Sequence, residues 1–429
     1  MRRTPVLRMV YVSLFSIYFY YKTGGLYFFL LILVSVTDFV IGRLLAATYR
    51  RGLVALSVLI NLGMLAYFKY TNLFIQIAND LAGHDVLAFR NIFLPVGISF
   101  FVFQSMSYTI DIYRRQLTPL TCWLDYFFYL SFFPQLVAGP IVRARDFIPQ
   151  IRQNPLRVTR EMFGRGLFLI MTGLVKKAVI SDYISVNFVD RVFDNPMLYS
   201  GFENLMGVYG YALQIYCDFS GYSDMAIGIA LLLGFRFPKN FDSPYKSATI
   251  TEFWRRWHIS LSTWLKDYLY ISLGGNRKGR FRTYVNLVVT MLLGGLWHGA
   301  APRFVLWGGF HGLLLALHKF LMRLFPRMKA TGADMKRGWR IAGIFVTFHL
   351  VCLGWIFFRA RDVGTGADIL EQVFTNFDIS LIPNIITGYW EIFAMMLVGY
   401  VAHFTPRRLQ ERACDAVIRN PLAVNALLI

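Results

Sequence analysis

Long apolar stretches recur along the whole chain and are separated by short polar connections. Most of them approach the length of about 20 residues that a helix needs to cross the hydrocarbon of a bilayer. The pattern therefore predicts an all-α polytopic membrane protein with about 10 to 11 transmembrane helices. The expected helices occupy residues 9–21, 25–47, 52–77, 91–112, 122–140, 163–183, 203–234, 284–300, 303–325, 341–358 and 383–403.

The segment 132–151, with the sequence FFPQLVAGPIVRARDFIPQI, does not fit a simple membrane helix. It is apolar enough to enter the membrane, but Pro134, Gly139 and Pro140 interrupt it. Non-helical backbone at membrane depth is tolerated only where it is buried in protein or lines a cavity. We therefore predict that this segment is re-entrant.

The segment 250–276 is amphipathic rather than uniformly apolar. Large apolar side chains recur in it at helical spacing, at Phe253, Trp257, Leu261 and Trp264. Such a helix lies in the membrane interface or re-enters the membrane. Two re-entrant candidates in one chain predict a cavity rather than a plain bundle of helices.

The first apolar stretch follows basic residues, as the apolar part of a signal peptide does. It is rich in tyrosine and phenylalanine, however, and no small-residue cleavage site follows it. We expect it to remain as a first membrane helix.

Composition supports a membrane protein, because 56% of the residues are hydrophobic and 16% are charged, against about 25% charged residues in soluble domains. The net charge of +20 would indicate a nucleic-acid partner in a soluble protein. Here the basic residues gather between apolar stretches, at residues 2–3, 49–52, 114–116, 276–282, 335–340 and 406–408. We interpret them as cytoplasmic loops that face an anionic leaflet, and we expect no nucleic-acid binding.

The four cysteines are far apart in the sequence, at Cys122, Cys217, Cys352 and Cys414. None of them forms a C-x-x-C pair, so the spacing predicts neither a disulfide framework nor a metal site. We expect them to be small apolar side chains within helices.

His298 lies in the sequence GGLWHGA, residues 294–300, where a long apolar stretch ends. Glycines flank the histidine on both sides, and glycine lets another backbone or a ligand come close. A desolvated imidazole has a lowered pKa and stays neutral, and in that form it can accept a proton from a hydroxyl group. His298 is therefore a candidate catalytic base.

His258 lies in the amphipathic segment, in the sequence FWRRWHISLS. The arginines and tryptophans beside it are typical of an interfacial anchor, and they could also bind an anion. An anchor explains the cationic and aromatic residues but leaves the histidine without a role.

The other histidines fit structural roles better. His311, His318 and His349 lie in apolar stretches, and we interpret them as hydrogen-bonded core imidazoles. His311 and His318 are seven residues apart on one helix face, but a metal site would need further ligands that the sequence does not place beside them. His84 and His403 lie near the ends of predicted helices, and we expect them at the membrane interface.

Two carboxylates, Asp218 and Asp224, lie in the apolar stretch 216–235. A carboxylate within the membrane needs a partner. Two interpretations remain open: a structural break in the helix, satisfied by serine and backbone groups, or a group that lines a cavity or orients a histidine.

Several long motifs together resemble the membrane-bound O-acyltransferase (MBOAT) family. These are LPVGISFFVFQSMSYTIDIYRR, FFPQLVAGPIVRARDF, YCDFSGYSDMAIG, FWRRWHISLSTWLKDYLYISLGGNRKG and GGLWHGA. They are most similar to the AlgI-type branch, the alginate and exopolysaccharide O-acetylation proteins. The D-alanyl transfer proteins of teichoic acid share RRWH and WHG at a similar separation.

The resemblance covers about residues 10–375, and residues 376–429 would add a C-terminal span and tail to a single integral-membrane domain, 1–429. AlgI-type proteins usually carry an extra apolar segment at the start and often continue further at the end, which leaves the helix count open. The resemblance implies a ring of membrane helices with re-entrant pieces around a central tunnel. It also implies that His298 is the catalytic residue and that His258 is a second essential histidine.

The resemblance further implies O-acetyl transfer in the bacterial cytoplasmic (inner) membrane. The donor would be a thioester, acetyl-coenzyme A or an acylated carrier, that enters from the cytoplasmic side, and no cofactor would be bound permanently. The acetyl group would move toward hydroxyls of an exported polysaccharide, by way of an extracytoplasmic partner transferase similar to SGNH hydrolases. His258 could orient His298, stabilise the oxyanion or guide the acceptor.

Two alternatives remain at this stage. The first is D-alanyl transfer to teichoic acid within the same class of enzymes. The second is a transporter or channel with histidines as proton relays, which the sequence disfavours because it contains no internal repeat.

Overall fold

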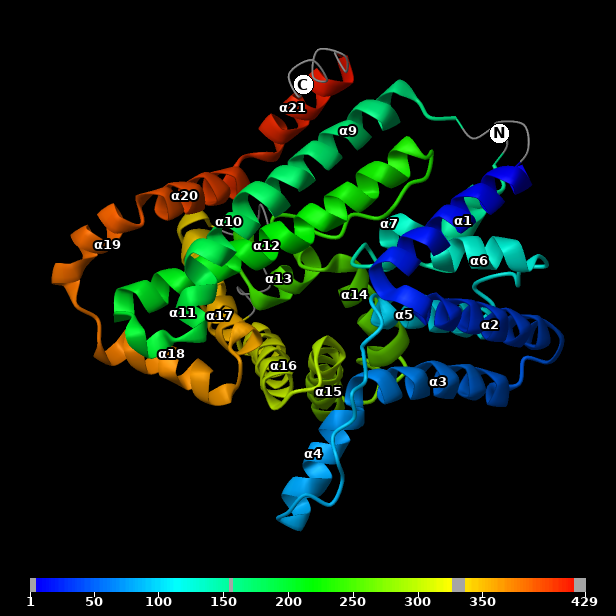
Figure 1. Cartoon of the computed structure of the whole chain (residues 1–429), viewed down its shortest axis with the longest axis horizontal. Helices are drawn as coiled ribbons and strands as arrows, with labels where there is room; N and C mark the ends of the chain where they lie inside the picture. The colour runs from blue at the N-terminus through cyan, green and yellow to red at the C-terminus, as the bar shows by residue number, and fades with distance from the viewer. Residues whose placement is uncertain (1–4, 154–156, 326–335, 420–429) are drawn as a thin grey trace. The chain divides into compact units, whose positions relative to one another are not determined.

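The computed structural model describes residues 5–153, 157–325 and 336–419 (Figure 1). Every regular element in these ranges is a helix, and they contain no strand. The predicted all-helical class is therefore confirmed. The basic start of the chain and the predicted tail after Arg419 lie outside the described residues.

The chain divides into two compact units, which we call unit 1 and unit 2. Unit 1 comprises Met1–Leu167 and Ala226–Pro238, and unit 2 comprises Phe168–Met225 and Lys239–Ile429. Two helices contribute residues to both units, namely α9 (Arg160–Leu174) and α12 (Gly201–Leu232).

Unit 1 is built around α5, which packs against α2 and α3 and is buried along most of its length. Its helices are α1 (Pro5–Gly24), α2 (Phe28–Thr48), α3 (Arg51–Leu65), α4 (Thr71–Ala82), α5 (Ile98–Tyr113), α6 (Trp123–Ser131), α7 (Phe133–Leu136) and α8 (Ala144–Ile151). The last two lie in the segment 132–151, where the prolines and glycine leave two short helices joined by a turn.

A buried carboxylate joins four helices of unit 1. Asp38 on α2 accepts hydrogen bonds from Ser57 Oγ at 2.7 Å, Asn61 Nδ2 at 2.6 Å and Ser105 Oγ at 2.5 Å. Ser105 also shares a hydrogen bond of 2.6 Å with the hydroxyl of Tyr126 on α6. An unpaired polar group in this interior would cost several kcal/mol. The network therefore fixes how α2, α3, α5 and α6 align.

Unit 2 contains the remaining helices and the candidate site. These helices are α10 (Asp182–Ile184), α11 (Asp190–Asp194), α13 (Ile250–Arg256), α14 (Ile259–Trp264), α15 (Arg280–His298), α16 (Pro302–Leu324), α17 (Arg337–Arg359), α18 (Val363–Thr375), α19 (Ile382–Gly388), α20 (Trp390–Phe404) and α21 (Arg407–Arg419). The helices α15 and α16 form a closely packed antiparallel pair.

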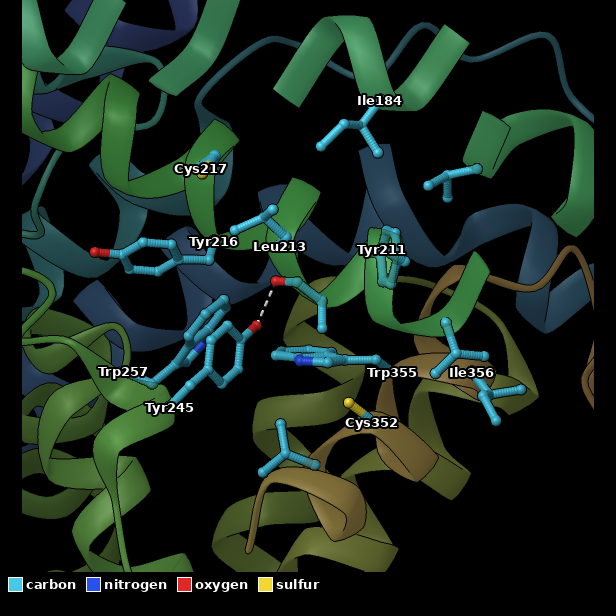
Figure 2. Packing of buried hydrophobic residues seen from close by; sticks show 14 of the residues in the cluster. Ile184, Tyr211, Leu213, Tyr216, Cys217, Tyr245, Trp257, Cys352, Trp355 and Ile356 are labelled. Carbon is cyan, nitrogen blue, oxygen red and sulfur yellow. Dashed lines mark hydrogen bonds between the residues drawn. The ribbon is translucent and has the colours of Figure 1, made fainter. Parts of the chain in front are cut away.

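Aromatic side chains dominate the core of unit 2 (Figure 2). The Tyr245 hydroxyl donates a hydrogen bond to the carbonyl oxygen of Ala212, which ties the loop before α13 to α12. The Trp257 ring lies 4.9 Å from the Trp355 ring, which stacks in turn on Trp307 at 5.9 Å. This packing holds the segment that carries His258 against α16 and α17.

The helix α12 is a continuous helix of 32 residues, so the predicted stretch 203–234 is not broken. Its two aspartates pair with lysines of the π-helical turn η3 (Val175–Ser181): Asp218 with Lys177 at 2.7 Å and Asp224 with Lys176 at 2.6 Å. The interpretation as a helix break satisfied by serine and backbone groups is therefore wrong, because the helix continues and the partners are lysines. That these carboxylates line a cavity stays a prediction.

Four helical stretches of the described chain are long and apolar enough to cross a membrane. They are Val6–Thr48, Arg51–Ala82, Pro302–Leu324 and Arg337–Arg359, and the bent pair Ile379–Gly388 and Trp390–Phe404 makes a fifth if it is one broken span. By length and hydropathy this is fewer than predicted. One reason is that Val6–Thr48 combines two predicted helices, and another is that the predicted 122–140 divides into short α6 and α7. The ring and the tunnel stay predictions.

Replacement of Asp38 by alanine should destabilise unit 1. It removes the acceptor that the buried donors of Ser57, Asn61 and Ser105 share. Each donor keeps another hydrogen-bond partner, so we expect a loss of about 0.5–1.5 kcal/mol for each bond removed. We expect a lower melting temperature for the purified protein in detergent, measured by tryptophan fluorescence. The matched control is Val36→Ala on the exposed side of α2. An equal melting temperature for both variants would show that the network does not hold the helices.

Gly295→Ala should disrupt the α15–α16 pair. A Cβ atom at Gly295 would lie 2.2 Å from the carbonyl oxygen of Phe304, which cannot move without the backbone of α16. The adjacent Gly294→Ala is the control, since its Cβ would meet only the tip of Leu265 at 3.1 Å. We expect Gly295→Ala to lower the free energy of unfolding by about 1–3 kcal/mol, and therefore to lower the melting temperature. Gly294→Ala should change the melting temperature far less. Similar stability of the two variants would contradict the close packing.

Candidate active site

The segment 250–276 does not form one continuous amphipathic helix. It contains two short α-helices, and the π-helical turn η7 (Leu265–Tyr270) continues the second of them. The first, α13, ends at Arg256, and the second, α14, begins at Ile259. Between them His258 has φ of 43° and ψ of 55°, in the left-handed region, and this breaks the helix. The predicted apolar face is buried as expected, at Phe253, Trp257, Leu261 and Trp264.

Asn240 stabilises the start of α14. Its main-chain oxygen accepts a hydrogen bond from Ile259 N at 2.8 Å, and its side-chain Oδ1 accepts one from Ser260 N at 3.2 Å. The first N–H groups of a helix have no partner within the helix. Because Asn240 supplies two acceptors for them, the second helix can begin directly after His258.

The His258 ring is buried, with 1% of its surface exposed. Its Nδ1 lies 3.2 Å from Asn240 Oδ1, and the edge of its ring meets Phe219 at 4.6 Å between centroids. In the part of the chain that the structure describes, Nε2 has no hydrogen-bond partner. Burial, and to a lesser degree a positive charge on His298, lower the pKa of His258 well below its usual range, so the imidazole stays neutral.

His298 is the last residue of α15 and is only half-buried. Its ring meets Trp307 and Phe358 edge-on, each at 5.2 Å between centroids. The following residue must be glycine, because a Cβ atom at Gly299 would lie 2.0 Å from the Phe304 ring. The predicted close approach around the GGLWHGA glycines is therefore confirmed.

Trp297 lies beside both candidate histidines. Its ring centroid is 6.2 Å from that of His258 and 5.0 Å from that of His298. The two histidines, forty residues apart in the sequence, thus come together in unit 2 from the α13–α14 break and the end of α15. The site has a buried neutral imidazole, a more accessible imidazole and aromatic walls, a set of groups that can move a proton where water is scarce.

Two of the other histidines are hydrogen-bonded, as predicted. His318 Nδ1 lies 2.8 Å from Thr251 Oγ1, and His349 Nε2 lies 2.8 Å from the Tyr209 hydroxyl. These contacts support structural roles for both imidazoles.

His311 and His403 differ from the predictions. His311 is buried among aromatic rings, including Trp254 and Trp307, but neither ring nitrogen has a hydrogen-bond partner in the described residues. His403, expected at the interface, is buried and accepts a hydrogen bond from Tyr245 N at 3.2 Å. This contact joins residues 158 positions apart, and no sequence pattern predicts it.

Comparison with known proteins assigns most of unit 2 to a known family. Residues 115–360 match the model of the MBOAT, membrane-bound O-acyltransferase family, and this range includes both candidate histidines. The chain is 43% identical over 326 residues to a probable alginate O-acetylase AlgI of Pseudomonas aeruginosa, with 75% of this chain and 60% of the relative covered. It thus spans about three fifths of the length of that relative.

Two further relatives have other names. A peptidoglycan O-acetyltransferase of Helicobacter pylori is 35% identical over 398 residues, which cover 86% of this chain and 74% of the relative. A teichoic acid D-alanyltransferase of Bacillus subtilis is 28% identical over 296 residues, 65% of this chain and 70% of the relative. From the family match and the extent of these similarities, the chain belongs to the membrane-bound O-acyltransferase family.

Proposed function

We propose that the protein is a membrane O-acetyltransferase with His258 and His298 as its catalytic residues. The observation that carries the proposal is that both imidazoles lie next to the Trp297 ring, within the region that matches the family. The names of the alginate and peptidoglycan relatives favour acetyl as the group transferred and a polysaccharide as the acceptor.

In the proposed reaction His298 is the general base. Its neutral imidazole takes the proton of an incoming hydroxyl group, and the hydroxyl oxygen forms a bond to the thioester carbonyl carbon. The tetrahedral intermediate then collapses, the carbon–sulfur bond breaks, and the proton passes from the imidazole to the leaving sulfur. Such assistance by a base is typically worth about 10²–10⁴-fold in rate.

The donor is a thioester, acetyl-coenzyme A or an acylated carrier, that approaches from the cytoplasmic side, with no cofactor held permanently. An exposed basic segment supports this direction: Arg277 and Lys278 lie in the loop before α15, and Arg280 and Arg282 lie in its first turn. Cationic side chains on one surface raise the local concentration of a phosphate-bearing ligand. The segment also fits a loop on the cytoplasmic face of a bacterial inner membrane.

The acetyl group is then destined for an exported polysaccharide, with an extracytoplasmic transferase similar to SGNH hydrolases as the partner that completes the transfer. D-alanyl transfer to teichoic acid is the second candidate, which the Bacillus subtilis relative supports at lower identity. The two candidates differ in the group that leaves the thioester, so product analysis separates them.

His298→Ala and His258→Ala should each abolish acetylation while the polymer is still made. The measurement is the amount of base-labile acetyl on the exported polysaccharide of cells that produce each variant at equal membrane levels. His84→Ala, an exposed histidine of unit 1, is the control and should retain acetylation. We expect a loss of about 10²–10⁴-fold for His298→Ala.

Normal acetylation in the His298 variant would remove this residue from the mechanism. Absence of acetyl in the wild type, together with base-labile D-alanine on the cell surface, would replace the acetyl proposal with the D-alanyl alternative. Transport of a solute that survives His298→Ala, with no acyl product at all, would favour a transporter.

A further inference from the structure

Asn240 joins α12, His258 and the start of α14 by hydrogen bonds. Its Oδ1 accepts hydrogen bonds from Ser260 N at 3.2 Å and Ser260 Oγ at 2.9 Å, and it lies 3.2 Å from His258 Nδ1. Its Nδ2 donates to Ser223 Oγ on α12 at 3.0 Å. The Asn240 side chain is buried, with 1% exposed, and so are its partners.

These contacts fix which atom of the Asn240 amide faces His258. A backbone N–H can only donate a hydrogen bond, so the atom that faces Ser260 N must be the amide oxygen. A flipped amide would place its NH₂ group against that N–H and would leave two donors facing each other. The orientation of Asn240 therefore follows from the main chain, which removes the usual ambiguity of an asparagine side chain.

The orientation of Asn240 in turn sets the tautomer of His258. Because Asn240 Oδ1 can only accept, the hydrogen between the two side chains must lie on His258 Nδ1. In a neutral imidazole the other nitrogen then carries a bare lone pair. That atom, Nε2, is buried and has no hydrogen-bond partner among the described residues.

We propose that Asn240 is a positioning residue that holds His258 as a neutral imidazole with its proton on Nδ1, so that Nε2 serves the site as a hydrogen-bond acceptor. This inference deepens the proposed function. The role of His258 in the site rests on that function, whereas its tautomer rests on the hydrogen bonds alone. Of the three roles considered for His258, it excludes donation of a hydrogen bond to the oxyanion. It leaves acceptance of a hydrogen bond, from the incoming hydroxyl group or from the His298 ring.

The charged groups near His258 are compatible with a neutral imidazole. His298 on α15 is the titratable group whose charge acts on it, and a positive charge there disfavours a second one. Lys239 and Asp242 flank Asn240 in the sequence, and both lie in an ion-pair cluster with Arg256 and Glu252. The aromatic neighbours of the ring carry no charge.

The tautomer is tested directly by nitrogen-15 NMR of histidine-labelled protein in lipid vesicles at neutral pH. The His258 signals are assigned by their absence from the His258→Gln variant. We expect a protonated Nδ1 and an unprotonated Nε2 in the wild type, and a mixture of tautomers in Asn240→Ala. A proton on Nε2 in the wild type would overturn the proposal. This readout needs no turnover, so it stands even if the proposed transferase activity fails.

The role is tested by the pH dependence of acetyl transfer in Asn240→Asp. A carboxylate beside Nδ1 stabilises the imidazolium and raises the pKa of His258, by about one unit or more. An acceptor nitrogen is lost when the imidazole is protonated, so the acidic limb of the profile should move to higher pH by a similar amount. Ser223→Ala is the matched control: it removes the partner of Asn240 Nδ2 but keeps Oδ1 in place, and its acidic limb should not move.

Extension of activity to higher pH in Asn240→Asp would show that His258 works as a protonated donor and would overturn the proposal. An unmoved acidic limb in folded Asn240→Asp would overturn it as well, since the protonation of His258 would then not matter for turnover. Equal shifts in Asn240→Asp and Ser223→Ala would reduce Asn240 to a structural residue.

Discussion

The hydrogen bonds that Asn240 accepts are the constraint on which the candidate site depends. They allow α14 to begin directly after His258, and they hold the His258 ring by its Nδ1. Without an acceptor at that point, the N–H groups at the start of α14 would be buried and unpaired, at a cost of about 1–3 kcal/mol each. The backbone break and the orientation of the imidazole thus both depend on the hydrogen bonds of one residue, Asn240.

The same requirement, that buried polar groups find partners, shapes both units. In unit 1 the carboxylate of Asp38 is surrounded by hydroxyl and amide donors from neighbouring helices. In unit 2 the aspartates of α12 pair with Lys176 and Lys177 instead. His258 departs from this requirement, as His311 does, because its Nε2 is buried and has no partner within the described chain. A buried acceptor without a partner is costly in a purely structural role, and the cost is understandable where a substrate supplies the missing donor.

The sequence predicted the parts of the structure that depend on periodicity and on residue type. The apolar face that includes Phe253 and Trp257 is buried, and the glycines beside His298 allow the close approach of α16. It did not predict the break at His258 or the role of Asn240, since both depend on contacts with a segment about twenty residues away. An asparagine in PKNFDSP has the appearance of a loop residue. Only the folded chain shows that its side-chain oxygen accepts hydrogen bonds from the N–H and hydroxyl groups of Ser260 and lies beside an imidazole.

The different exposure of the two histidines fits the division of work that the proposed reaction requires. A thioester must be kept from water. The rings of Phe219 and Trp297 pack around His258 and exclude water from that side of the site. A reacting hydroxyl must nevertheless enter, and the half-buried His298, at the end of α15, is the more exposed of the two histidines. In a dry site a single well-placed acceptor is worth more than it would be in water. Fixing the tautomer of His258 through Asn240 therefore sets the direction of its hydrogen bond before a substrate arrives, so that none of the binding energy is spent on turning the ring.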